Sequence, residues 1–302
     1  MSETAPAKAY RSFSPSRIWT LATHTVTQLL RMRIIAFLAV FGFIAIAAGF
    51  AFPAMSPEQQ LKLLKDVSFG VLQIFSIVIA IAATSLLLPK DLEDRTLYTI
   101  LSKPVPRYEY LIGKLLGVLL LIGGGLLVMD IIFSAIVWLK QTMIIGGQIA
   151  ALQQEQSATP ENIAALQTII GKYGLTWSLH AGVFAIFLKA SVIAALSLLI
   201  SCFASSTLFT IVVAFAFTIA GHGQQLIREW LFQSKATSGL DKILGGILAF
   251  ICPDLKLFDV VDKVITGEVI TAMTLASMGG MALLYIVGYT AAAYLFFAEK
   301  EL

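Results

Sequence analysis

Residues 178–204 read SLHAGVFAIFLKASVIAALSLLISCFA, and Lys189 is the single Asp, Glu, Lys or Arg among them. A helix rises about 1.5 Å per residue, so this stretch can cross a hydrocarbon core about 30 Å thick. Five further apolar stretches, each about 17 to 27 residues long, meet the same criterion. The sequence therefore predicts an all-α polytopic membrane protein with six transmembrane helices, at 34–52, 69–88, 115–138, 178–204, 206–222 and 271–297.

The composition supports a membrane protein and excludes several other classes. Of the 302 residues, 58% are hydrophobic and only 13% are charged, and the mean hydropathy of +0.86 is far above that of a soluble domain. The net charge of +3 is small and the basic residues flank apolar stretches, which favours membrane lipid over nucleic acid as a partner. Cys202 and Cys252 are expected near opposite membrane faces, too far apart for a disulfide. We expect no metal and no cofactor.

The N-terminal part is expected to precede the first span in two pieces. Residues 1–16 are polar and predict a disordered cytoplasmic leader without a signal peptide, whereas 17–302 form a single membrane domain. From Arg17 to Arg33, helical spacing of apolar residues predicts a helix on the membrane surface. The apolar positions of that helix are Ile18, Ala22, Val26 and Leu29.

The connections between spans are predicted from prolines and polar runs. Spans one and two are expected to stop at Pro53 and Pro89, with a short polar loop containing Lys62 and Lys65 between them. Spans four and five are expected to fold back on each other at Ser205 and Ser206.

Residues 243–252 are too short to cross the membrane and indicate a re-entrant or interfacial element. Whether they re-enter is left open by the sequence. A second surface helix is then expected, with an apolar face opposite a charged one. Its apolar face contains Leu257, Val260, Val261 and Val264, and its charged face contains Lys256, Asp259, Asp262 and Lys263.

Basic residues set the expected orientation. They are frequent before span one and between spans two and three, and sparser in the alternate loops, so both termini are predicted to be cytoplasmic in a multi-pass protein of the cytoplasmic (inner) cell membrane. This places 89–114 in the cytoplasm and makes 139–177 and 223–270 external segments.

The most informative segment is 90–117, KDLEDRTLYTILSKPVPRYEYLIGKLLG. Asp91 can cap a short helix, Asp91 and Arg95 stand at i and i+4, and Pro104 and Pro106 end the pattern. From the pattern alone, a solvated connector and a helix presented to a partner are equally good interpretations.

This segment resembles the cytoplasmic signature of the type-two permeases of the ATP-binding-cassette transporter superfamily. In that family the helix between spans two and three docks into a cleft on the ATPase subunit, so the resemblance implies that Asp91 to Ser102 form this coupling helix and that Lys103 to Lys114 connect it to span three. The layout is also similar to permeases of copper-enzyme maturation systems, although no Met or His cluster here offers copper ligands. The residues implied in ATPase coupling are Asp91, Glu93, Arg95, Thr96, Leu97, Ser102, Pro104, Arg107 and Lys114.

The resemblance implies the permease subunit of an exporter, with a separate ATPase subunit and a second permease half, identical or different, as partners. The chain has no GxxxxGK[ST] phosphate loop, so it is expected neither to bind ATP nor to be an enzyme. Two alternatives from other classes are an intramembrane enzyme, such as a protease or lipid transferase, and a membrane scaffold without transport. The enzyme is disfavoured because the chain has only three histidines and neither HExxH nor GxSxG. The sequence does not specify the substrate.

Two ionisable residues, Asp130 and Lys189, lie inside predicted spans. Counted from the external ends of spans three and four, their depths differ by only about 4 to 5 Å. An unpaired charge near mid-membrane costs about 2.5 to 3.5 kcal/mol on insertion scales, which favours pairing or a wet cavity over lipid exposure. We hypothesise that the two residues pair; the alternative is that Asp130 faces water and Lys189 snorkels separately.

Overall fold

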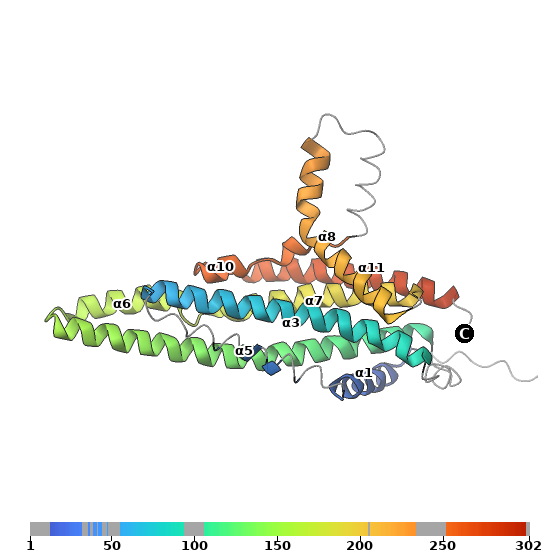
Figure 1. Cartoon of the computed structure of the whole chain (residues 1–302), viewed down its shortest axis with the longest axis horizontal. Helices are drawn as coiled ribbons and strands as arrows, with labels where there is room; N and C mark the ends of the chain where they lie inside the picture. The colour runs from blue at the N-terminus through green and yellow to red at the C-terminus, as the bar shows by residue number, and fades with distance from the viewer. Residues whose placement is uncertain are drawn as a thin grey trace, which may run out of the picture.

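The computed structural model describes residues 13–31, 55–93, 106–204, 206–233 and 252–299, together with single positions between 36 and 47. Helices make up most of this part of the chain, and it contains no strand. The long helices run side by side in an elongated bundle, with α1 near one end (Figure 1). The helices are α1 (Pro15–Leu30), α3 (Pro57–Glu93), α5 (Arg107–Gln154), α6 (Pro160–Tyr173), α7 (Trp177–Phe203), α8 (Thr207–Gln233), η1 (Leu255–Phe258), α10 (Val261–Ile265) and α11 (Ala272–Glu299).

Helix α7 is the centre of the bundle. In the most apolar 18-residue stretch of the segment that contains α7, 83% of the residues are buried within the chain, against 22% in the corresponding stretch of α11. Helix α7 packs against α3, α5, α8 and α11. A helix that is apolar all round is a buried helix, and small side chains let its neighbours approach closely. The buried small residues of α7 include Ala190, Ser191, Ala194, Ala195 and Ser197.

Five helical segments of the described chain are long and apolar enough to cross a membrane. They contain the predicted spans 69–88, 115–138, 178–204, 206–222 and 271–297 to within a residue or two at their ends. The chain is therefore an all-α, multi-pass membrane protein. The remaining predicted span, 34–52, lies outside the described residues apart from single positions.

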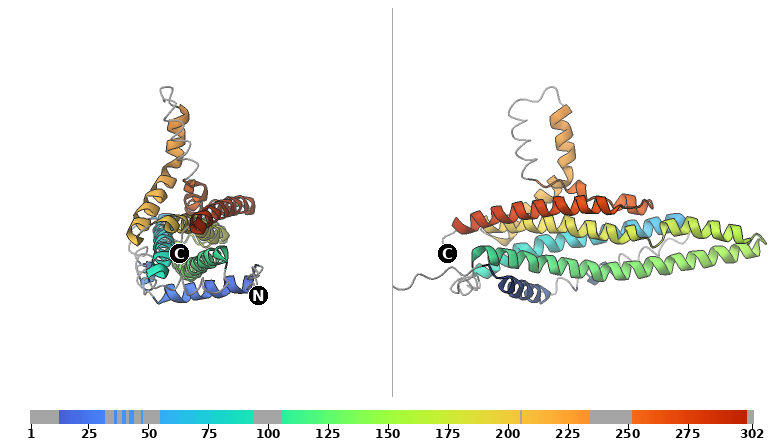
Figure 2. Two further views of the ribbon diagram at one scale, coloured as in Figure 1. Left: turned by 90° about the vertical axis from the view of Figure 1, so that its right-hand side faces the viewer. Right: turned by 180° about the vertical axis from the view of Figure 1, so that it is seen from behind.

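Helix α5 continues far beyond the predicted span 115–138. Its 48 residues correspond to about 72 Å, more than twice the thickness of a hydrocarbon core. The segment 139–177 is consequently largely helical: it contains the end of α5 and all of α6, which is capped at its start by the Thr159 hydroxyl accepting from the Asn162 amide. The helices α5 and α6 form a hairpin that projects from one end of the bundle (Figure 2).

Helix α3 is also longer than predicted, at both ends. It begins at Pro57, so Lys62 and Lys65 lie on a helix and the predicted polar loop around them is wrong. The helix also continues through Pro89 to Glu93, so Pro89 does not end it, although the apolar segment itself ends at Leu87. A proline removes only one backbone donor, and neighbouring helices in a membrane bundle can compensate for that loss.

The predicted reversal between spans four and five is confirmed. Helix α7 ends at Phe203, α8 begins at Thr207, and the two helices pack together. Beyond the predicted span, α8 continues to Gln233 and turns away from the bundle (Figure 1).

The predicted surface helix around 256–264 is two short helices instead of one. The 3-10 helix η1 is followed by a break at Asp259 and Val260, and then by α10. Of the predicted apolar face, Val260, Val261 and Val264 are buried within the chain, whereas Leu257 is 44% exposed. The break follows because η1 and α10 pack on different parts of the bundle, η1 on α8 and α7 and α10 on α3 and α7. Residues 243–251 lie outside the described part of the chain.

Candidate functional site

The predicted coupling segment joins the end of α3 to the start of α5 along the chain. Asp91 and Glu93 lie in the last turn of α3, and Arg107 is the first residue of α5. Asp91 therefore continues α3 and does not cap a separate helix, which corrects the sequence prediction. The other predicted coupling residues between the two helices lie outside the described residues. They are Arg95, Thr96, Leu97, Ser102 and Pro104.

Arg107 connects the start of α5 to the end of α11. Its guanidinium Nη1 donates to the carbonyl oxygens of Phe297 at 2.9 Å and Ala298 at 2.7 Å. The guanidinium carbon Cζ lies 5.9 Å from the centre of the Phe297 ring. The last carbonyls of a helix lack partners within the helix and carry a partial negative charge, so a cation is favourable there. Arg107 thus fixes two helix ends to each other beside the predicted coupling segment.

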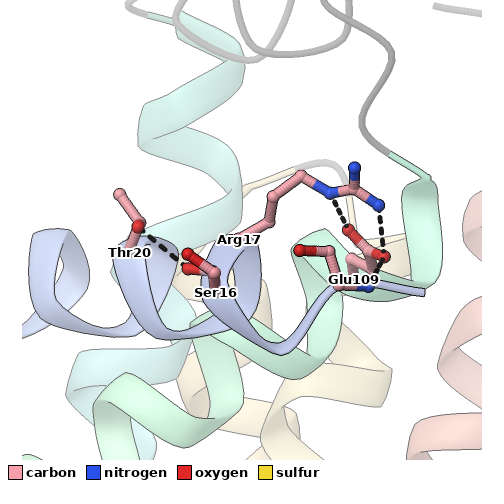
Figure 3. A network of polar contacts seen from close by, with 5 residues as sticks. Ser16, Arg17, Thr20 and Glu109 are labelled. Carbon is pink, nitrogen blue, oxygen red and sulfur yellow. Dashed lines mark hydrogen bonds and ion pairs between the residues drawn. The ribbon is translucent and has the colours of Figure 1, made fainter. Parts of the chain in front are cut away.

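The start of α5 is also fixed to α1 by a bidentate ion pair (Figure 3). The Arg17 Nε donates to Glu109 Oε2 at 2.6 Å, and Arg17 Nη2 donates to Glu109 Oε1 at 2.8 Å. The Ser14 amide donates to the same Oε1 at 2.9 Å. Bidentate arginine–carboxylate pairs are directional and stronger than neutral hydrogen bonds, so they orient the helices that carry them.

This ion pair perturbs both partners. The Arg17 hydrogen bonds, and more weakly the Ser14 amide, hold the pKa of Glu109 below its ordinary value against the opposing effect of burial. The same hydrogen bond to Glu109 raises the pKa of Arg17. Glu109 lies in the first turn of α5, ahead of the apolar stretch 115–138. Its carboxylate is thus charged, fully buried and hydrogen-bonded at the base of the bundle.

Close helix packing completes the α1–α5 junction. Helix α1 buries Ile18, Ala22, Thr25 and Leu29 and lies across the bundle (Figure 2). A Cβ added at Gly117 would lie 2.8 Å from the Ala22 carbonyl oxygen, and one at Gly113 would lie 2.6 Å from Leu21 Cβ. The two glycines form a GxxxG pattern that allows this close approach. The predicted N-terminal helix is confirmed, but its apolar face packs on α5.

Lys114, the last of the predicted coupling residues, is 1% exposed and belongs to the same junction. Its Nζ donates to Gln28 Oε1 of α1 at 3.3 Å and lies 5.6 Å from the centre of the Tyr110 ring. Sequence reasoning found Arg107 and Lys114 but missed Arg17 and Glu109, because Arg17 was assigned to lipid phosphates. The only signal for Glu109 in the sequence was that a carboxylate stands just before an apolar run, where a buried charge needs a partner.

Asp130 and Lys189 do not pair, so that hypothesis is wrong. Asp130 Oδ2 lies 2.7 Å from Nδ1 of His180 on α7. Its other carboxylate oxygen is buried and has no partner among the described residues. Lys189 is nine residues further along α7 than His180, which is about 13 Å along the helix axis. The predicted depths were counted from the external ends of spans three and four, as if both ends lay at the same level. Helix α5 does not end near Trp138 but continues to Gln154, so the two counts did not start at the same depth.

Lys189 lies in a different group of polar residues, where α7, α8 and η1 meet. It is 2% exposed, and it makes no hydrogen bond or ion pair with any other described residue. Helix η1 carries Lys256 and ends at the C-cap residue Asp259, and it packs on α7 and on α8, the helix of His222. Sequence reasoning named Lys189 without these residues, which come from two other elements, η1 and α8.

The described residues contain no group of three or more His, Cys, Asp or Glu side chains able to hold a metal ion. What the α1–α5 junction can do is mechanical: it joins the ends of α1, α5 and α11 at the point where the predicted coupling segment enters the bundle.

No protein-family model matches this chain, and no curated protein is similar enough to it to count as a relative.

Proposed function

We propose that this chain is the membrane permease subunit of an ATP-binding-cassette exporter whose ATPase is a separate polypeptide. The observation that carries the proposal is the rigid attachment of the chain that follows the predicted coupling segment. At the start of α5, Glu109 is held by Arg17 of α1 and Arg107 is bonded to the end of α11. A partner that moves the segment would therefore move three helices together.

The mechanism follows from the length and continuity of α5. A helix transmits a displacement along its axis because every turn is hydrogen-bonded to the next. Closure of an ATPase on the coupling segment would tilt the base of α5, and α5 contacts α7, α3 and α11. The movement would thus reach the central helix of the bundle without any chemistry in this chain.

The proposal also covers the family, the number of spans and the topology. The family is inferred from the resemblance of residues 90–117, and residues 34–52 form the sixth span. Both termini are cytoplasmic, the membrane is the cytoplasmic membrane, and a second permease half completes the pathway. Transport and the ATPase partner are likewise parts of the proposal.

The test is whether an ATPase subunit co-purifies with this chain from its native membrane. Replacing Glu93 and Arg95 together by Ala is expected to release the ATPase, or to leave its ATP hydrolysis insensitive to the permease, while the chain still inserts and folds. The matched control is the pair Glu161→Ala and Lys172→Ala at the two ends of α6, which removes one acid and one base at the opposite end of the bundle.

The control is expected to retain ATPase association at the wild-type level. Wild-type association and coupling in the Glu93→Ala, Arg95→Ala variant would refute the coupling role. Absence of any ATPase from the wild-type preparation would refute the exporter itself.

A further inference from the structure

A cavity of about 380 Å³ lies along α5, and we call it the α5 cavity. Helix α5 forms one wall, from Leu120 to Ile132. Phe75 of α3, Val26 of α1 and Phe43 of the predicted first span belong to the other walls. The volume falls within the range of about 300 to 1,000 Å³ that is usual for pockets that bind small molecules.

The α5 cavity lies at the depth of the hydrocarbon core. Its wall from Leu120 to Ile132 lies inside the apolar stretch 115–138 and is about 18 Å long. Every described residue that lines the cavity is apolar or a glycine. A bound water needs two to four polar partners, and the side chains of this lining provide none. Any occupant of the α5 cavity is therefore apolar.

Three consecutive glycines, Gly123 to Gly125, stand in the wall that α5 provides. A glycine inside a helix destabilises it relative to alanine, so each of the three calls for a packing reason. A Cβ at Gly123 would lie 3.2 Å from the Phe187 ring, and one at Gly125 would lie 3.4 Å from the Phe75 ring. At Gly124 no atom of the neighbouring described helices comes within 4 Å of where a Cβ would stand. Helix packing accounts for Gly123, whereas Gly124 faces the cavity and keeps it wide.

The dimensions of the α5 cavity select its occupant. A volume of 380 Å³ spread over about 18 Å corresponds to a space about 5 Å across. A helix with its side chains is about 10 to 12 Å across, so a helix of a partner protein or of a second copy is too wide. A single file of carbon atoms is about 4 Å wide, because non-bonded carbons touch at about 3.5 to 4.0 Å. The length is close to one leaflet, which is half of a hydrocarbon core about 30 Å thick.

We propose that the α5 cavity binds one hydrocarbon chain of a membrane lipid, which lies along α5 over Gly124. Inside a membrane such binding is driven by close packing, because the surrounding lipid is as apolar as the cavity. The shape that Gly124 leaves is therefore what distinguishes this site from the rest of the lipid-facing surface. The bound chain contacts α1 and α5, the two helices that the Arg17–Glu109 ion pair joins. This inference goes beyond the proposed function and requires no ATPase.

The experiment uses a phosphatidylcholine that carries a photoreactive diazirine in one acyl chain. The full chain is illuminated with this lipid in dodecyl maltoside micelles, and the labelled residues are identified by peptide mass spectrometry. Labelling is expected at Leu120 and Ile132, which are 39% and 36% exposed and line the cavity. It is expected to be at least about fivefold weaker at Met281 of α11, which is 39% exposed and does not line this cavity.

Gly124→Leu tests the cavity directly, because the leucine side chain would occupy the space of the lipid chain. The variant is expected to lose labelling at Leu120 and Ile132 by at least about fivefold. The matched control is Gly280→Leu on α11, where a Cβ also has no described atom within 4 Å. It makes the same change in helix propensity within an apolar span and is expected to be labelled as the wild type is.

If Gly124→Leu does not fold, Val128→Trp fills the same cavity from one turn further along α5. Val128 is 56% exposed and lines the cavity, so this variant is expected to lose labelling at Leu120 to a similar extent.

Two outcomes would overturn the site. Equal labelling of Leu120, Ile132 and Met281 in the wild type would mean that lipid only surrounds the protein. Wild-type labelling of Leu120 and Ile132 in a folded Gly124→Leu or Val128→Trp variant would show that the cavity does not hold the chain. Because no ATPase is present, either result is independent of ATPase co-purification.

Discussion

Asp130 and Lys189 are both ionisable residues inside helices long enough to cross the membrane, yet their surroundings differ. The Asp130 side chain is 19% exposed and meets His180 of the neighbouring helix at 2.7 Å. Lys189 is 2% exposed and has no comparable partner among the described residues. The more deeply buried residue is thus the less compensated one. The difference separates a polar contact that holds α5 to α7 from a buried lysine that no described side chain bonds.

The largest expected effect is the loss of the partner of Asp130. His180→Ala removes the hydrogen bond to Oδ2 and leaves a mostly buried carboxylate with neither oxygen bonded to a described residue, so we expect destabilisation by about 2 kcal/mol. His180→Asn, which can still donate, is the control and is expected to lose less than half as much. The measurement is denaturant unfolding of the purified chain in detergent micelles. A loss below about 0.5 kcal/mol for His180→Ala would show that the contact holds nothing together.

The next largest effect is expected in double-mutant cycles that compare Asp130 with His180 and Asp130 with Lys189. Asp130→Asn combined with His180→Ala is expected to show a coupling free energy of about 1 kcal/mol, because the two side chains touch. Asp130→Asn combined with Lys189→Met is expected to be additive within about 0.5 kcal/mol, because they do not. The opposite ranking of the two cycles would restore the pairing that the structure contradicts. The same unfolding assay measures both cycles.

Much of the fold follows from the sequence because lipid contact imposes long apolar runs. The spans within α7 and α11 were predicted to within one or two residues at each end, since polar residues or turns flank both. The ends of α3 and α5 were not predicted. Hydropathy marks where a helix leaves lipid, and it does not mark where the helix ends. Residues 139–154 are rich in Gln, Ala, Ile and Leu, which allow a helix to continue, and α5 extends through them to Gln154.

The contacts of the site were less accessible to sequence reasoning. Glu109 stands inside the segment that resembles the permease signature, but its partner Arg17 is 92 residues earlier. Nothing in the local pattern pairs them. Lys189 was found because a lysine in an apolar run is conspicuous, whereas Lys256 and Asp259 looked like the polar face of a surface helix. Their approach to α7 depends on a chain reversal that no periodicity encodes.

The smallest expected effect on the free energy of unfolding is that of Lys189→Met. Methionine has a similar length and no charge, so the substitution removes the cost of burying an ammonium while keeping most of the packing. We expect a change within about 0.5 kcal/mol, or a gain, in the same unfolding assay. The matched control is Lys114→Met. It removes an equally buried lysine that does have a partner, Gln28, and is expected to lower the free energy of unfolding by about 1 kcal/mol.

A loss of stability above about 1 kcal/mol for Lys189→Met would mean that the folded chain already supplies its ammonium with a stabilising partner, and the contrast with Asp130 would fail. A near-neutral result would instead show that Lys189 does not contribute to the stability of the bundle.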